Sequence, residues 1–132
     1  MSASENKRLI QEMYAALSRG DGATFLAALA DDVEFNISGT TQFSGVMRGK
    51  KEVIERLLVP LGAALPGGIT VTIDSILAEG DRVVAQGRGS ATTKAGKPYN
   101  NRYCWVFRIE GGKVKEVSEY LDTELVTTTF GR

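Results

Sequence analysis

Histidine is absent from this 132-residue sequence. Its absence excludes the Ser-His-Asp triads and Cys-His dyads that catalyse acyl transfer, and it removes a common zinc ligand. Proton transfer must therefore use a carboxylate, tyrosine, lysine, arginine or bound water. The adjacent acids Asp31 and Asp32, with Glu34 nearby, are typical of a solvated helix end, and no second acidic cluster accompanies them. We expect neither a metal nor a cofactor.

Cysteine is nearly absent, and neither sign of charge is in excess. The single cysteine, Cys104, cannot form an internal disulfide, which is consistent with a reducing cytoplasm. The 16 basic and 16 acidic residues give no electrostatic reason to expect nucleic acid or an anionic membrane as partner. The longest largely apolar stretch, residues 57–65, is far shorter than the ~20 residues of a membrane helix. Since no apolar signal segment follows Met1 either, we expect a cytoplasmic protein.

The periodicity of apolar residues predicts a single α+β domain over residues 1–132. Helical spacing indicates helices over 5–19, capped by Ser4, and over 23–30 and 50–58. Alternation predicts strands over 33–37, around 46–47, and then over 69–78, 82–93, 98–109 and 113–121. The long strands must curve strongly to bury one face on the helices, and Gly87 and Gly89 would supply the bend.

The last strand carries the strongest catalytic candidate. Alternation places Val117, Glu119 and Leu121 on one face, and the apolar neighbours mark that face as interior. We expect Val117 and Leu121 to contact a bound ligand. A carboxylate there loses solvation, so its pKa should rise towards neutrality, which suits general acid–base work. The alternative is that Glu119 lies at a rim or pairs with Arg88 or Arg102.

The preceding strand predicts an aromatic wall. Asn101, Tyr103, Trp105 and Phe107 share one face, and two large aromatics, a phenol and an amide suit an apolar ligand with a few polar groups. We expect Tyr103 to orient a substrate, and Asn101 and Trp105 to bind it. Plain core packing is the alternative, and it is the interpretation we favour for Phe107.

Five further polar side chains are weaker candidates. An inward Arg88, with Gln86 beside it, would stabilise negative charge in a substrate, whereas an outward one would be solvated. Asn36 and Tyr14 would reach the mouth of a cavity unless local hydrogen bonds or packing occupy them. Asp122, at the strand end, is a secondary ligand-binding candidate.

Four segments, in this order and spacing, resemble one superfamily. They are residues 14–21 (YAALSRGD), 30–33 (ADDV), 80–84 (GDRVV) and the terminal GKV and EYLD motifs at 112–114 and 119–122. The pattern is similar to the cone-shaped fold shared by nuclear transport factor 2, ketosteroid isomerase and the SnoaL-like polyketide cyclases. The resemblance implies three N-terminal helices on a strongly curved, mainly antiparallel sheet around a hydrophobic pocket. Because the superfamily holds isomerases, cyclases, dehydratases, epoxide hydrolases and non-catalytic binders, it implies a pocket and no single reaction.

Carrying the catalytic positions over from these families leaves one acid in place. The positions of the ketosteroid isomerase set hold Met13, Ile37 or its neighbour Asn36, and Trp105. The C-terminal acid of the limonene epoxide hydrolases and the acid of the SnoaL-like cyclases both fall on Glu119. The hydrolases' arginine and first aspartate fall near residues 86–89, where an arginine is present and a carboxylate is not.

These observations predict a protein that binds a small apolar organic molecule and catalyses cofactor-free acid–base chemistry through Glu119. The alternatives are a non-catalytic binder of a hydrophobic metabolite and an interaction module. The outer sheet face would carry Cys104, Val106 and Tyr120, a mixture too apolar for free exposure. It predicts a homodimer packed sheet to sheet, as the resemblance also implies.

Overall fold

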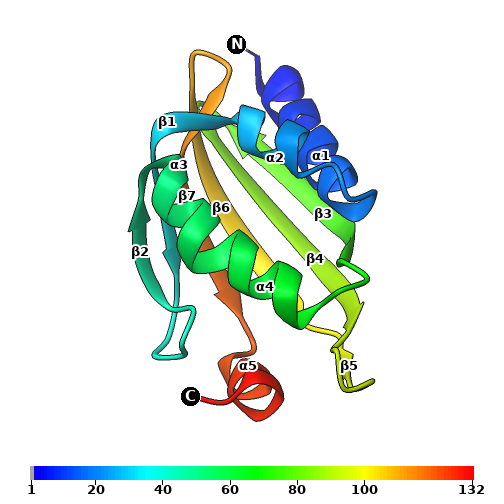
Figure 1. Cartoon of the computed structure of the whole chain (residues 1–132). Coiled ribbons are helices and arrows are strands. Elements are labelled where there is room, and N and C mark those ends of the chain that lie inside the picture. The colour runs from blue at the N-terminus through cyan, green and yellow to red at the C-terminus, as the bar shows by residue number, and fades with distance from the viewer. Residues whose placement is uncertain (1) are drawn as a thin grey trace.

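The computed structural model describes residues 2–132 and has the expected α+β architecture (Figure 1). In chain order the elements are α1 (Ala3–Ser18), α2 (Gly22–Ala28), β1 (Leu29–Ile37), β2 (Gly45–Arg48), α3 (Gly49–Val53), a π-helical turn η1 (Ile54–Leu58), α4 (Val59–Ala64), β3 (Thr70–Glu79), β4 (Arg82–Thr92), β5 (Pro98–Tyr99), β6 (Arg102–Glu110), β7 (Lys113–Leu121) and α5 (Thr123–Phe130).

The strands form one curved sheet in the order β2-β1-β7-β6-β4-β3, with β5 paired to β4. All neighbours are antiparallel except β1 and β7, which are parallel. The helices α1 and α2 and the segment from α3 to α4 cover the concave face, and α5 lies at one end of the sheet (Figure 1). The core is the side-chain cluster enclosed between the sheet and these helices.

The helices differ from the sequence prediction at their ends. Ser2, not Ser4, caps α1, because Glu5 stands three residues after Ser2 and completes a reciprocal capping box with it. The third predicted helix continues past Pro60 to Ala64 through the π-helical turn. Pro60 is tolerated because it lies in the first turn of α4, where a missing N–H costs least.

Gly87 and Gly89 lie on the concave face of β4, where there is no room for a side chain. A Cβ at Gly87 would lie 2.6 Å from the Thr72 carbonyl oxygen, and one at Gly89 would lie 2.9 Å from the Tyr103 ring. The register of β3 against β4 also shifts between Ile73 and Ser75, which marks a bulge beside Gly87. The glycines therefore allow the sheet to bend closely around the aromatic side chains of β6.

Most strands match their predicted ranges, but the strand predicted over 98–109 is interrupted at residues 100–101. There the buried Asn101 side chain replaces ladder hydrogen bonds, since its Oδ1 accepts from the backbone N–H groups of Arg102 and Asp122. Within residues 2–132, no helix has both the length and the apolar character that crossing a membrane requires.

Candidate functional site

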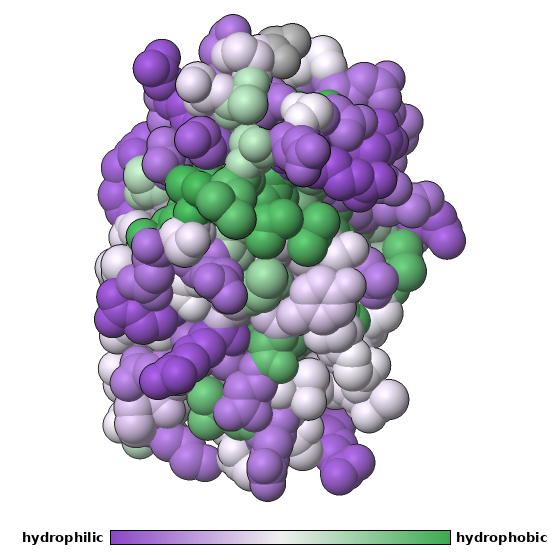
Figure 2. All heavy atoms as spheres, turned by 180° about the vertical axis from the view of Figure 1, so that it is seen from behind, coloured by the Kyte–Doolittle hydropathy of each residue, from purple (hydrophilic) through white to green (hydrophobic). Residues whose placement is uncertain are grey.

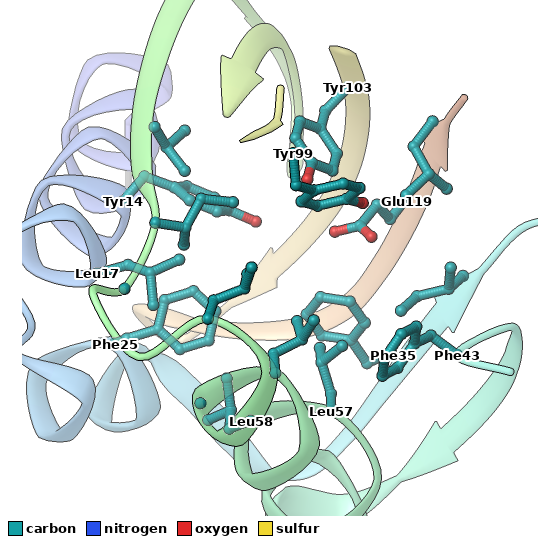
Figure 3. A pocket seen from close by; sticks show the side chains of 18 of the residues that line it. Tyr14, Leu17, Phe25, Phe35, Phe43, Leu57, Leu58, Tyr99, Tyr103 and Glu119 are labelled. Carbon is teal, nitrogen blue, oxygen red and sulfur yellow. The ribbon is translucent and has the colours of Figure 1, made fainter. Parts of the chain in front are cut away.

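A cavity of about 280 Å³ lies between the concave face of the sheet and the covering helices (Figure 3). This volume is slightly below the range of about 300–1,000 Å³ that is usual for ligand pockets. Its lining is mostly aliphatic and aromatic. Among the described residues, the polar groups that line it belong to Tyr14, Thr41, Tyr99, Tyr103, Trp105 and Glu119, and no lysine or arginine lines it.

Glu119 extends into this cavity from β7, between Ile37 of β1 and Trp105 of β6. The indole N–H of Trp105 donates a hydrogen bond of 2.8 Å to Glu119 Oε1. Within the described part of the chain, no hydrogen bond reaches Oε2. One carboxyl oxygen is therefore fixed by the protein, and the other faces the cavity.

Burial raises the pKa of Glu119 from 4.5 to about 7, and the hydrogen bond from Trp105 partly opposes this rise. The side chain remains only partly accessible to water, through the cavity itself. Both the acid and the carboxylate are therefore populated near neutral pH, which is the condition for a proton donor and acceptor.

Tyr14 reaches the cavity from α1, and Figure 3 shows its hydroxyl directed towards Glu119. Its ring stacks on Trp105, with a centroid separation of 4.6 Å. The hydroxyl is buried and has no hydrogen-bond partner among the described residues. Burial, with a smaller contribution from the charge of Glu119, raises the pKa of Tyr14 well above its usual value. Tyr14 therefore remains a protonated donor to which the described residues offer no acceptor.

Tyr103 and Tyr99 form the adjoining part of the wall. The Tyr103 ring stacks almost parallel on Trp105 at 4.9 Å, and burial raises the pKa of Tyr103 strongly. Tyr99 Oη accepts a hydrogen bond of 2.9 Å from Asn101 Nδ2, which also donates to the Asp122 carbonyl. Asn101 thus supports the wall from behind and does not line the cavity, a correction to its predicted contact with a ligand.

Arg88, Gln86 and Asn36 lie on the outer face of the sheet and do not line the cavity, which corrects their predicted contact with a ligand. For Arg88 this is the outward alternative. Arg88 makes a bidentate pair with Asp74, at 2.9 and 2.8 Å. The reason is parity, because the inward positions of β4 include Gly87 and Gly89, and the residue between them points outward.

The three candidates on or near β7 lie in three different places. Leu121 lines the cavity, as expected, but Val117 is fully buried in the core and does not line it. Asp122 is exposed and caps α5, since its carboxylate accepts a hydrogen bond of 3.1 Å from the Leu125 N–H. A ligand contact by Asp122 is therefore not supported.

Sequence reasoning missed much of the lining, and two of the missed parts had a signal in the sequence. Tyr99 stands two residues before Asn101, so extending the alternation of Tyr103 and Trp105 by two further steps would have found it. The helical wall holds Leu57, Leu58, Leu61 and Leu65, whose helical spacing was visible but whose direction depends on where the helix crosses the sheet.

A model of the SnoaL-like domain matches residues 10–117. The chain belongs to the SnoaL-like family. Uncharacterized proteins of Mycobacterium tuberculosis and Mycobacterium bovis are each 30% identical to it over 122 residues, which is 92% of either chain.

Solved structures share the fold of this SnoaL-like protein. A nuclear transport factor 2-like protein of unknown function from Burkholderia pseudomallei is 26% identical, with a TM-score of 0.84 over 100% of both chains. TerC, co-crystallized with polyporic acid, is 22% identical, with a TM-score of 0.82 over 95% of this chain and 97% of its own. An epoxide hydrolase of M. tuberculosis is 23% identical, with a TM-score of 0.78 over 96% and 90%. The predicted cone-shaped fold is confirmed.

Proposed function

We propose that the cavity binds a small, neutral, largely apolar organic molecule and that Glu119 transfers protons to and from it without a cofactor. The observation that carries this proposal is a carboxyl group with a pKa of about 7 inside an apolar cavity. A group that titrates near ambient pH serves equally as proton acceptor and donor. Isomerisation, cyclisation, dehydration and epoxide opening are the reaction types that suit it.

The contacts around Glu119 support this role. Trp105 holds Oε1, which leaves Oε2 for the substrate. The unpartnered hydroxyl of Tyr14 would donate to an oxygen atom of the ligand, and Tyr103 would orient the ligand beside it. In the described lining no lysine or arginine stands opposite Glu119, so a ligand anion would remain an unpaired buried charge. A neutral ligand is therefore favoured.

Comparison adds support only at the level of the fold. TerC holds a small organic molecule in its crystals, and the M. tuberculosis protein is named as an epoxide hydrolase. Both have the fold of this chain, which supports a small-molecule site within this architecture.

Two neutral probe molecules, whose reactions require different proton transfers, test the proposal. Exchange of the α-protons of cyclohexanone in D₂O is followed by NMR, and hydration of cyclohexene oxide is followed by gas chromatography. We expect Glu119→Gln to lower any catalysed rate by roughly 10²–10⁴, the usual contribution of a general acid–base group. Glu116→Gln, an outward carboxyl on the same strand, is the matched control and should leave the rate unchanged.

A non-catalytic binder is the second candidate. The outward position of Arg88 favours it, because no guanidinium then stabilises a developing oxyanion in the cavity. Trp105, the single tryptophan of the sequence, reports on binding through its fluorescence. Binding that is unaffected by Glu119→Gln, together with no conversion of either probe, would establish the binder.

We also propose a homodimer that packs sheet to sheet, which keeps the interaction-module alternative open. Six charged side chains form a row across the outer face, one from each strand from β3 to β2. In that order they are Glu79, Arg82, Arg108, Glu116, Glu34 and Arg48. The signs read − + + − − +, so reversing the row inverts every sign. Two copies related by a two-fold axis along the strands would therefore bring opposite charges together at each position.

A second row, which we call the apolar row because four of its six members are Leu or Val, lies beside the charged one, two residues along each strand. Its members are Leu77, Val84, Val106, Ser118, Asn36 and Val46. Leu77 is 68% exposed, and Figure 2 shows an apolar patch on this face between hydrophilic areas. A second copy of the chain would cover this patch. Because the sequence has a single cysteine and so no internal disulfide, we also propose the reducing cytoplasm as its compartment.

A further inference from the structure

The cavity opens to solvent at a ring of glycines. Among the described residues that line it, three are exposed, namely Gly20, Gly62 and Gly68. A fourth glycine in the lining, Gly22, is half-buried. Gly20 and Gly22 flank the turn between α1 and α2, whereas Gly62 lies in α4 and Gly68 just before β3. The mouth of the cavity therefore lies between the α1–α2 turn and α4.

The missing side chains leave free space at this mouth. A Cβ placed on any of the four glycines would meet no atom within 4 Å outside its chain neighbours and its own helix backbone. Gly20 and Gly68 have φ angles of 80° and 77°, so their turns require glycine. The backbone gives no such reason at Gly22 or Gly62, and glycine within a helix such as α4 is less favourable than alanine.

The polar groups of the cavity lie away from the mouth. Glu119 and Tyr103 belong to the sheet, and Tyr14 belongs to the inner side of α1, whereas the rim comes from the α1–α2 turn and α4. Leu58 and Leu61 complete the rim side with apolar surface. A ligand whose oxygen atom meets Tyr14 would thus place its apolar end towards the mouth.

We propose that the apolar end of the ligand extends through this glycine mouth, and that Gly22 and Gly62 set the ligand length that the protein accepts. The inference rests on the proposed function only in taking the cavity as the ligand site. The ligand class is a neutral molecule with an acceptor oxygen at one end and an extended apolar tail. In an enclosed cavity of about 280 Å³ such a tail would be rejected, but here it has an exit.

A series of 2-alkanones of increasing chain length tests this proposal. Affinity is measured from the fluorescence of Trp105 in the wild type, Gly62→Leu and Gly22→Leu. The matched control is Gly67→Leu, because Gly67 has free space around its Cβ and no positive φ but does not line the cavity. For the wild type we expect affinity to rise about fourfold per methylene, equivalent to ~0.8 kcal/mol, and then to level off as the tail reaches solvent.

In Gly62→Leu and Gly22→Leu we expect short ketones to bind as in the wild type and long ketones to bind at least tenfold more weakly. Gly67→Leu should reproduce the wild-type length profile. Identical length profiles in all four proteins would overturn the proposal, as would an abrupt loss of long ketones by the wild type. Failure of every ketone to bind the wild type would overturn the proposed function as well, whereas loss of the Glu119-dependent rate alone would leave the length profile standing.

Discussion

At the scale of single residues, the protonation of Glu119 links the site to stability. Its folded pKa of about 7 lies above the ordinary value of 4.5, so the folded chain holds a proton that the unfolded chain has released. The stabilisation by that proton is fully present below pH 4.5 and is lost as pH rises through 7. The difference between the two pKa values corresponds to roughly 3 kcal/mol of folding free energy.

Glu119→Gln should therefore be more stable than the wild type at pH 8, by up to roughly 3 kcal/mol, and close to it at pH 4.5. The measurement is the free energy of unfolding in urea at the two pH values. Glu116→Gln is the control, because Arg108 lowers the pKa of Glu116 and its carboxylate stabilises the fold at high pH. A gain at pH 8 in both variants would contradict the assignment of the buried charge to Glu119.

Trp105 acts on the same proton. Its indole N–H stabilises the carboxylate form of Glu119, so Trp105→Phe keeps an aromatic ring but should raise the pKa of Glu119 further. A hydrogen bond to a charged group contributes about 1.5–3 kcal/mol, which corresponds to a rise of about one to two pH units. Carboxyl-carbon NMR titration measures this shift. An unchanged or lower pKa would show that the hydrogen bond does not control the titration.

At the scale of elements, strand alternation fixed the inward face of β7 but left that of β4 open, for one physical reason. Along β7, apolar neighbours on both sides of Glu119 fix which face is buried. Along β4, the inward positions near Arg88 are glycines, which carry no hydropathy signal, so the sequence left its direction open. The aromatic side chains of β6 fill the space above those glycines, and that packing exists only in the folded sheet.

The α5 helix was not predicted because its own residues favour it weakly. It contains four threonines, whose branched side chains lower helix propensity. Its start depends on the Asp122 cap, and its end packs through Phe130 against Tyr99 and Phe43. Both partners come from distant parts of the chain, so tertiary contacts stabilise what local sequence does not specify.

The close approach at Gly87 gives a prediction for the sheet. Gly87→Ala would bring a Cβ against the Thr72 carbonyl, a backbone atom that cannot move aside independently, and should destabilise the fold by about 1–3 kcal/mol. Gly67→Ala, at an open position with no positive φ, is the control and should be neutral or slightly stabilising. Thermal unfolding of both variants makes the comparison. Equal melting temperatures would mean that β3 can move away from β4.

At the scale of the whole molecule, the proposed dimer would match both rows of the outer sheet face. In the two-fold arrangement, each charge of the charged row would face the opposite charge in the second copy. Leu77 and Val46, at opposite ends of the apolar row, would then face each other. A chain of zero formal net charge has no general repulsion to keep two such faces apart. The same two-fold arrangement leaves the cavity mouth, on the helical side, open to solvent.

Val106→Glu should therefore convert the dimer into a monomer, because it places a carboxylate in the centre of the apolar row. We expect the dimer dissociation constant to rise at least tenfold, measured by light scattering over a micromolar dilution series. Val59→Glu is the control, since Val59 is 61% exposed on α4, on the opposite side of the molecule, and should remain dimeric. A wild-type mass of one chain at these concentrations would refute the dimer, and a monomer in both variants would refute its placement on the sheet.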